Sequence, residues 1–257
     1  MRFPRRSADQ PGVFPEIDQS AGQPELSGSS STSQIVPPPF DTGAAFPRTG
    51  LVSLRSLFSE ARFLHTDDIA VCDAHHDSRC VTPGGLFAAL PGTRQHGLEH
   101  LPEALLSGAA AVLSDRSPAG RSVPCCIVPD ARRAYGALCH ALHFQPSKRL
   151  GVAGVTGTNG KSTTTWLIQQ VLSRLGRHCG WLGTIQYSDG IVTAPAALTT
   201  PDSRTMASWL GRMVARGTQY AALELSSHAL AQQRAAGLQL DVAVITNVTR
   251  DHLDYHP

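Results

Sequence analysis

Ten residues near the middle of the chain combine glycine, lysine and hydroxyl side chains in a pattern suited to phosphate. The segment 154–163 reads Gly-Val-Thr-Gly-Thr-Asn-Gly-Lys-Ser-Thr. Backbone N–H groups of such a turn can face an anion, Lys161 supplies charge to the outer phosphates, and the Ser162 hydroxyl can hold Mg²⁺. The usual phosphate loop has four residues between its first glycine and Gly-Lys, whereas Gly154 stands one residue too early. We predict a nucleoside triphosphate site here.

A second group of polar residues follows later apolar segments. Glu224 ends an apolar run, where phosphate-loop enzymes keep the carboxylate that completes the Mg²⁺ shell. Asp-His-Leu-Asp-Tyr-His, residues 251–256, offers imidazole and carboxylate groups that can coordinate a divalent ion. A surface glutamate and a hydrogen-bonded structural histidine are the alternatives, and an Asp-His-x-Asp run alone is a weak signal.

The segments around these residues predict the elements that must position them. The loop follows an apolar strand at 149–155 and opens a helix at 162–175. That helix places five apolar residues on one face: Leu167, Ile168, Val171, Leu172 and Leu175. Further strands are expected at 84–90, 109–113, 125–128, 178–183, 220–225 and 241–246, and helices at 98–107, 130–144, 203–216 and 228–236.

This alternation predicts an α/β fold in two parts. A small N-terminal α/β domain is expected at 49–146. An incomplete phosphate-loop (Rossmann-like) central domain with a mostly parallel sheet is expected at 147–257. Residues 1–48, rich in Ser, Pro, Gly and Gln, indicate a disordered leader. A sheet of about four strands is thin for this architecture, so the sequence looks truncated and a C-terminal domain is expected to be absent.

Composition narrows the class of protein. The 257 residues carry 22 basic and 20 acidic side chains without a basic stripe, which disfavours a nucleic-acid partner. The six cysteines show no Cys-x-x-Cys pair or zinc spacing, as is usual for thiols in a reducing compartment. No apolar run approaches the roughly 20 residues of a spanning helix, and no signal-peptide pattern follows the basic start. A cytoplasmic protein without a membrane partner is predicted.

Five stretches, in order, resemble the Mur ligases, in particular those of the tripeptide synthetase type that extend UDP-N-acetylmuramoyl peptides. They are Asp77-Ser-Arg79 with 84–92, then 154–165, Leu198-Thr-Thr-Pro-Asp202, 224–234 and 246–256. The Gly-Thr-Asn-Gly-Lys form of the loop is typical of this superfamily. The sequence departs from the family at Gly85, where aspartate is usual, and at His76, where an apolar residue is common.

The resemblance implies an ATP-dependent amide ligase. ATP would phosphorylate the terminal carboxylate of UDP-N-acetylmuramoyl-L-alanyl-D-glutamate, and the amine of a diamino acid, diaminopimelate or lysine, would attack the acyl phosphate. Phosphorylation turns a poor electrophile into one with a leaving group, and Lys161 with Mg²⁺ would offset the repulsion between two anions. The resemblance also implies a monomer.

Site residues follow from the same resemblance. The catalytic residues would be Lys161, Glu224 and His252. Mg²⁺ would be held by Ser162 and Glu224, and a second ion by Glu224 and His252. ATP would contact Gly157, Thr158, Asn159, Gly160, Lys161, Ser162 and Thr163. The uridine part of the substrate would contact Ser78, Thr93, Arg94 and Gln95, and its diphosphate and sugar would contact Thr199, Thr200, Ser226, Gln232 and Arg234.

Two further interpretations stay open. The family carries a carbamylated lysine and a third domain beyond the position of Pro257, so this chain is expected to bind ligands but form no amide bond at a useful rate. A catalytically incomplete protein that binds ATP or UDP-muramoyl peptide is therefore the main alternative. An unrelated phosphate-loop GTPase or kinase is disfavoured, since the sequence has no Asn-Lys-x-Asp segment.

Overall fold

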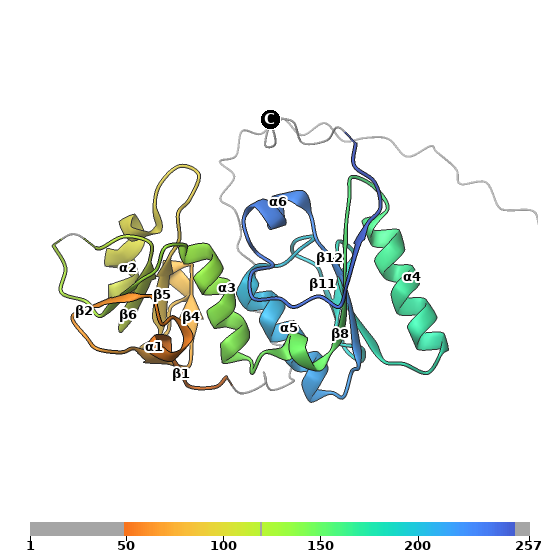
Figure 1. The fold of residues 1–257 in the computed structure, drawn as a ribbon, viewed down its shortest axis with the longest axis horizontal. Helices are drawn as coiled ribbons and strands as arrows, with labels where there is room; N and C mark the ends of the chain where they lie inside the picture. Colours follow the sequence, from red (N-terminus) through yellow and green to blue (C-terminus); the bar gives the residue numbers. More distant parts are fainter. Residues whose placement is uncertain (1–48, 119, 250–257) are drawn as a thin grey trace, which may run out of the picture. The chain divides into compact units, whose positions relative to one another are not determined.

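The computed structural model describes residues 49–118 and 120–249, which contain two main β-sheets and the helices around them (Figure 1). All of these residues fall within one compact unit of the chain. The predicted leader and the 251–256 segment with His252 lie outside the described residues. Mostly parallel sheets combined with helices confirm the predicted α/β class.

The first sheet has five strands in the order β2-β7-β6-β5-β4. These are β2 (Arg62–Leu64), β4 (Ala74–His75), β5 (Leu86–Ala89), β6 (Ala111–Ser114) and β7 (Cys125–Ile127). Strands β4 to β7 are parallel, β2 runs antiparallel to β7, and a separate pair joins β1 (Val52–Ser53) to β3 (Ala70–Val71). Every residue of β5 and β6 is buried, as expected of a parallel sheet covered on both faces.

Short helices surround this first sheet. They are α1 (Leu54–Leu57), α2 (Leu101–Leu106) and α3 (Ala131–Leu142), with 3₁₀ turns η1 (Ser78–Cys80) and η2 (Gly97–His100). Helix α3 begins where the sequence predicted, because the Asp130 side chain accepts a hydrogen bond from the Arg133 N–H and caps the first turn. The predicted helix at 98–107 divides into η2 and α2.

The second sheet has six strands in the order β11-β10-β9-β12-β8-β13. These are β8 (Gly151–Thr156), β9 (Cys179–Leu182), β10 (Gln186–Ser188), β11 (Thr193–Pro195), β12 (Tyr220–Glu224) and β13 (Val242–Ile245). Strands β9, β12, β8 and β13 are the four parallel strands that the sequence predicts. The antiparallel hairpin β10–β11 extends this sheet and was not predicted.

Helices cover both faces of the second sheet (Figure 1). They are α4 (Lys161–Arg174) and α5 (Ser203–Ala215), followed by the short α6 (Ser227–Ala231), and a 3₁₀ turn η3 (Pro146–Arg149) leads into β8. Met206, Leu210 and Met213 of α5 are almost fully buried in one core with residues of β8, β9 and β12. This core fixes the sheet whose carboxyl ends carry the phosphate loop.

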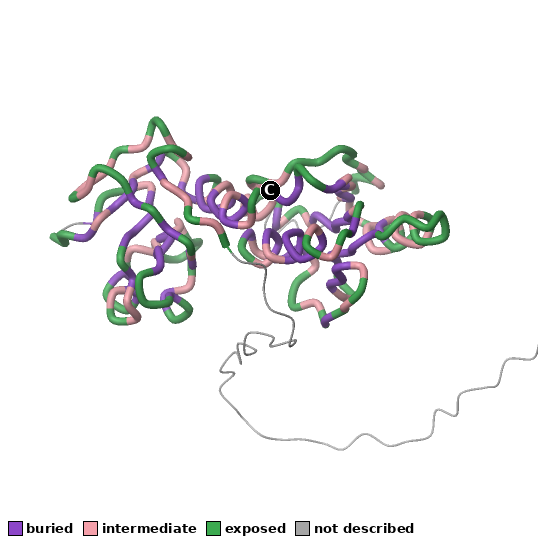
Figure 2. The backbone as a smooth tube through the Cα atoms, turned by 90° about the horizontal axis from the view of Figure 1, so that it is seen from below, coloured by how far each residue is buried: buried purple, intermediate pink, exposed green. Residues whose placement is uncertain are grey.

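Helix α4 packs differently from its sequence pattern. Leu167, Val171 and Leu175, expected on an apolar face, are 49%, 55% and 69% exposed, and Thr165 is the buried residue of the helix. Figure 2 shows exposed and intermediate stretches along α4. The reason lies in the polar contact beneath it: the buried Thr165 hydroxyl accepts a hydrogen bond from the Trp181 indole of β9 at 3.1 Å. Three of the five residues expected on the apolar face are therefore exposed, while Ile168 and Leu172 are half-buried.

The predicted helix at 228–236 is wrong beyond Ala231. Gln233 adopts a left-handed backbone with φ of 57°, and the Arg234 N–H bonds back to the Ala229 carbonyl at 2.8 Å. The turn lets the Arg234 guanidinium donate to the Thr200 carbonyl at 3.1 Å, a tertiary contact that overrides the helical propensity of this Ala-rich and Gln-rich run. Among the described residues, no helix is long and apolar enough to cross a bilayer.

Candidate nucleotide and substrate site

The phosphate loop lies between β8 and α4, at the carboxyl end of a central parallel strand. Gly157 and Gly160 have φ of 134° and 84°, which residues with a Cβ rarely adopt. A Cβ at position 157 would also stand 2.2 Å from the Thr246 hydroxyl. Helix α4 begins at Lys161, so its first N–H groups have no partner within the helix and open toward an anion. The predicted ATP residues thus form a strand-loop-helix cradle.

The segment that follows β13 holds this loop in shape. The Asn247 carbonyl accepts from the Thr158 N–H at 3.2 Å, and its side-chain oxygen accepts from the Asn159 N–H at 3.0 Å. The Thr246 hydroxyl donates to the Asn159 carbonyl at 2.6 Å. The loop is therefore built from two parts of the chain about 90 residues apart, which meet because β8 and β13 are neighbours.

Lys161 folds back over the loop. Its ammonium donates to the Gly157 carbonyl at 2.6 Å and to the Thr158 carbonyl at 3.0 Å. It also lines, with the loop, two adjacent cavities of about 340 Å³ each. The positive charge is held at the cavity where outer phosphates would lie.

Glu224 ends β12 beside the loop and is 1% exposed. The Ser162 hydroxyl donates to its Oε2 at 2.9 Å. Thr184, two residues after β9, donates from its N–H to Oε1 and from its hydroxyl to Oε2, both at 3.0 Å. A buried carboxylate thus accepts three hydrogen bonds, as burial of such a group requires.

The contact between Ser162 and Glu224 fits Mg²⁺. Mg²⁺ prefers hard oxygen ligands and is usually held by one or two protein groups together with phosphate oxygens and water. A hydroxyl and a carboxylate oxygen 2.9 Å apart at the mouth of a phosphate loop provide such a pair. Within residues 49–118 and 120–249, no group of three His, Cys, Asp or Glu side chains is arranged to hold a metal. The proposed second ion depends on His252, outside these ranges.

Three predicted diphosphate residues lie close to the loop. Thr199 and Ser226 line one of the 340 Å³ cavities together with residues 158–163. The buried Thr200 hydroxyl donates to the Glu224 carbonyl at 2.7 Å and accepts from the Ser226 N–H at 2.9 Å. Ser226 in turn caps α6 by accepting from the Ala229 N–H. The carboxyl end of β12 and the loop that precedes α5 thus meet at one cavity.

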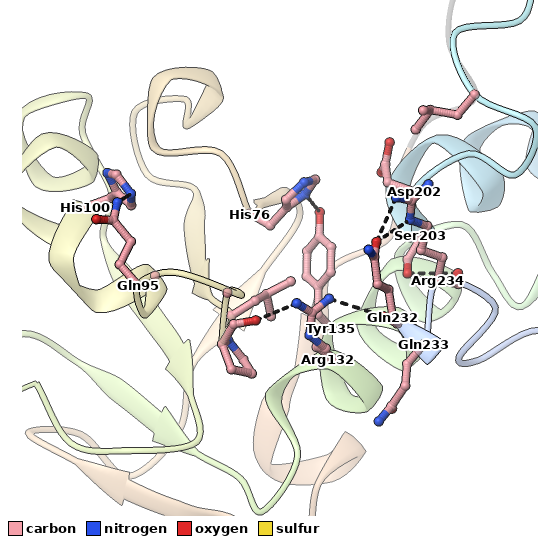
Figure 3. A pocket seen from close by; sticks show the side chains of 15 residues that line it. His76, Gln95, His100, Arg132, Tyr135, Asp202, Ser203, Gln232, Gln233 and Arg234 are labelled. Atoms are coloured by element: carbon pink, nitrogen blue, oxygen red, sulfur yellow. Dashed lines mark hydrogen bonds between the residues drawn. The ribbon is translucent and has the colours of Figure 1, made fainter. Parts of the chain in front are cut away.

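Gln232 and Arg234 line a larger cavity of about 430 Å³ (Figure 3). Two arginines reach this cavity from different elements. Arg132 of α3 donates to the Pro91 and Gln232 carbonyls, and Arg234 donates to the Gln232 side-chain oxygen from both Nε and Nη2. Two guanidinium groups make this cavity suited to an anionic ligand.

Tyr135 and His76 form one wall of the same cavity (Figure 3). The Tyr135 hydroxyl lies 3.3 Å from the His76 Nδ1, and the rings meet edge to face. Burial raises the pKa of Tyr135 well above its usual value, so its hydroxyl stays protonated. Tyr135 therefore adds an uncharged hydroxyl to this wall, beside the charged arginines.

The predicted uridine contacts are not all brought together. Gln95 lines the 430 Å³ cavity, whereas Thr93 and Arg94 line a separate polar cavity of about 290 Å³ that shares Pro91, Gly92 and Gln95 with it. Ser78 lines neither cavity; it is buried and donates its hydroxyl to the Glu103 carboxylate. A role for Ser78 toward uridine stays a prediction.

The sequence interpretation missed two residues of this site. Thr184 directly follows Gly183 at the carboxyl end of a parallel strand, the same edge as Glu224, and that placement was the available signal. The sequence offered no signal for Arg132, because an arginine near the start of a predicted helix is usually a solvent-exposed side chain.

Known proteins resemble this chain in sequence. Residues 155–257 match the sequence model of the Mur ligase middle domain. The UDP-N-acetylmuramoyl-L-alanyl-D-glutamate–2,6-diaminopimelate ligase of Geobacillus thermodenitrificans is 45% identical over 180 residues, 70% of this chain and 37% of that protein. The ligase of the same name from Pseudomonas aeruginosa is 39% identical over 209 residues, which are 80% of this chain and 42% of that protein. The chain thus spans about two fifths of the length of these relatives.

Solved structures show the same fold. The structure of a UDP-N-acetylmuramoyl-L-alanyl-D-glutamate–2,6-diaminopimelate ligase has a TM-score of 0.66 at 28% identity and covers 81% of this chain and 42% of its own. The Acinetobacter baumannii UDP-N-acetylmuramoylalanyl-D-glutamyl-2,6-diaminopimelate–D-alanyl-D-alanyl ligase has a TM-score of 0.55 at 23% identity, covering 82% and 44%. The second likeness concerns the fold alone.

Proposed function

The chain belongs to the Mur ligase family, and from that premise we propose that it supplies the nucleotide-binding and substrate-binding part of an ATP-dependent amide ligase of peptidoglycan precursor synthesis. Its substrates would be UDP-N-acetylmuramoyl-L-alanyl-D-glutamate and a diamino acid, and it would act in the cytoplasm. The observation that carries the proposal is the hydrogen bond from Ser162, the residue after Lys161, to the buried Glu224 carboxylate.

Each group at the loop has a role in that reaction. In the proposed chemistry, an oxygen of the substrate carboxylate attacks the γ-phosphorus of ATP and ADP leaves. The amine then attacks the acyl carbon, phosphate leaves, and the amine loses a proton. Lys161 and the N–H groups that open α4 would offset the charge of the phosphates as the two anions approach. Mg²⁺, when bound, would neutralise phosphate oxygens from the side of Ser162 and Glu224.

The substrate would lie along two of the cavities described above. Thr199 and Ser226 line the cavity beside the phosphate loop, which suits the reacting end of the substrate or its phosphates. Arg132 and Arg234 line the cavity of about 430 Å³. A guanidinium can bind a phosphate with two parallel hydrogen bonds, so these arginines suit a nucleoside diphosphate.

Nucleotide titration of Lys161→Ala tests the proposal. The wild-type chain should bind ATP at fixed Mg²⁺, and the variant should bind it about 10-fold to 100-fold more weakly, because a hydrogen-bonded charge contributes about 1.5–3 kcal/mol. Lys148→Ala is the matched control, since Lys148 is the chain's other lysine and is exposed in η3. Unchanged ATP affinity of Lys161→Ala, or equal losses in both variants, would contradict the assignment.

A further inference from the structure

Thr184 contacts both Glu224, which the proposed function assigns to Mg²⁺, and Thr199, which it assigns to the substrate. Its hydroxyl lies 3.0 Å from the Glu224 Oε2 and 3.2 Å from the Thr199 hydroxyl, and its N–H holds the Glu224 Oε1 at 3.0 Å. Thr184 also lines the cavity of about 340 Å³ beside residues 158–163. The residue thus lies between the carboxylate assigned to Mg²⁺ and a threonine assigned to the substrate.

The direction of these bonds follows from counting protons. A threonine hydroxyl has one proton to donate and lone pairs that accept. A carboxylate is the stronger acceptor, because hydrogen bonds to an ionised group are about twice as strong as neutral ones. Thr184 therefore donates to Glu224, and Thr199 donates to Thr184. The result is an ordered chain of donors from Thr199 through Thr184 to Glu224.

The backbone beside Thr184 is shaped for the same carboxylate. A Cβ at Gly183 would stand 2.0 Å from the Glu224 Oε1 and 2.7 Å from its carboxyl carbon. Glycine is thus needed at 183 for the turn after β9 to approach Glu224. With Ser162 on Oε2 and the Thr184 N–H on Oε1, both carboxylate oxygens are fixed by protein donors.

We propose that Thr184 is a positioning residue that orients Glu224 toward Mg²⁺ and couples this carboxylate to Thr199 across the nucleotide cavity. This inference rests on the proposed function, because it assigns Mg²⁺ to Glu224 and substrate to Thr199. A ligand that draws the Thr199 hydroxyl away would change the hydrogen bonding of Thr184 and, through it, the orientation of Glu224. Metal binding and substrate binding would then be linked by one hydroxyl.

The experiment measures ATP affinity in EDTA and at a series of Mg²⁺ concentrations. The quantity compared between variants is the increase in ATP affinity that Mg²⁺ causes, called here the Mg²⁺-dependent gain. Thr184→Val keeps the side-chain shape and the N–H to Oε1 but removes the hydroxyl. Its ATP affinity in EDTA should match that of the wild type, while its Mg²⁺-dependent gain should fall about tenfold. Thr184→Ser should restore the gain. Thr193→Val, exposed on the edge strand β11 of the same sheet, is the control and should leave both values unchanged.

The coupling is tested by a double-mutant cycle with Thr199→Val. If Thr199 acts through Thr184, Thr199→Val should reduce the Mg²⁺-dependent gain in the wild-type background and have no further effect on Thr184→Val. Additive effects in the double variant would overturn the coupling. If Thr184→Val or the double variant folds poorly, an unchanged Mg²⁺-dependent gain in Thr199→Val alone would overturn it. An unchanged Mg²⁺-dependent gain in Thr184→Val would overturn the positioning role. A wild-type chain that binds no ATP in either condition would instead overturn the proposed function, and this inference with it.

Discussion

Arg234 shows how one side chain can be prepared for an anion before the anion arrives. Its guanidinium is held by the Thr200 carbonyl and by the Gln232 side-chain oxygen, at distances of 2.7 to 3.1 Å. These bonds use some of the five N–H donors of the group and fix its plane. The remaining donors can meet a ligand at the cavity of about 430 Å³ without first losing rotamer freedom.

Arg234→Lys should therefore weaken binding of UDP-N-acetylmuramoyl-L-alanyl-D-glutamate about tenfold, because an ammonium cannot reproduce a planar fork held by two partners. ATP affinity should not change. Calorimetry with each ligand measures both, and Arg174→Lys, at the exposed end of α4, is the matched control. Wild-type substrate affinity in Arg234→Lys would refute the role of this guanidinium.

The sequence predicts the place of a site residue well where a chemically reactive or metal-binding side chain lies at the end of a predicted strand or the start of a predicted helix. Lys161, Ser162 and Glu224 each follow or open a regular element, so their meeting could be expected from the parallel order of the strands. Thr184 and Arg132 could not be found in this way. Their contacts depend on the turn after β9 and on the packing of α3 near Gln232, which no local pattern encodes.

At the scale of elements, α3 contains one buried histidine, His140, and the half-buried His143 follows as the C-terminal cap of the helix. His140 is fully buried, and neither of its ring nitrogens has a hydrogen-bond partner within the described residues. Burial, with a smaller contribution from His143, lowers the pKa of His140 to about 4. Burial and the nearby Arg204 likewise lower the pKa of His143 to about 4. Both rings are therefore neutral in the folded chain at neutral pH.

The free energy of unfolding should fall as the pH drops from about 6.5 toward 4. In this window the unfolded chain takes up protons, since its histidines have their usual pKa near 6.5, while the folded chain does not. His140→Leu should flatten this dependence and raise stability at neutral pH by about 1 kcal/mol, because it removes unsatisfied buried nitrogens. Denaturant unfolding at several pH values tests this. His100→Leu, on an exposed position of η2, is the control, and a variant with the wild-type slope would contradict the prediction.

Elements were predictable where apolar runs are long and isolated by turns. The parallel strands β5, β8, β12 and β13 follow this rule. The hairpin β10–β11 does not, because its strands have only three residues each. Helix α6 ends early because Arg234 makes a tertiary contact, and α4 leaves Leu167, Val171 and Leu175 exposed. In both cases tertiary packing overrides the local periodicity.

At the scale of the molecule, apolar side chains remain exposed at one side of the second sheet. Val242 and Ile245 of the edge strand β13 are 53% and 67% exposed, and Val248 is 84% exposed. Unpaired strand edges and exposed apolar surface favour association between chains. The monomer expected from the resemblance should therefore give way to larger species as the concentration of this chain rises.

Val242→Lys should shift that association to higher concentration, because a lysine on an edge strand opposes edge-to-edge pairing. Sedimentation velocity over a concentration series measures the shift. Leu106→Lys removes an apolar residue that is more exposed than Val242, 91% at the end of α2, and should change little. Equal shifts in the two variants would show that general charge, rather than this edge, governs association.

The ties between the phosphate loop and residues 246–249 have a consequence for how the chain responds to ligands. Thr158 and Asn159 are hydrogen-bonded to Thr246, Asn247 and Thr249. A nucleotide that orders the loop should therefore also stabilise residues 246–249 in the conformation that makes these hydrogen bonds. By linkage, ATP should slow amide hydrogen exchange at 246–249 as well as at 157–163. Exchange in the segment that follows the edge strand β13 would then report whether the loop holds a nucleotide.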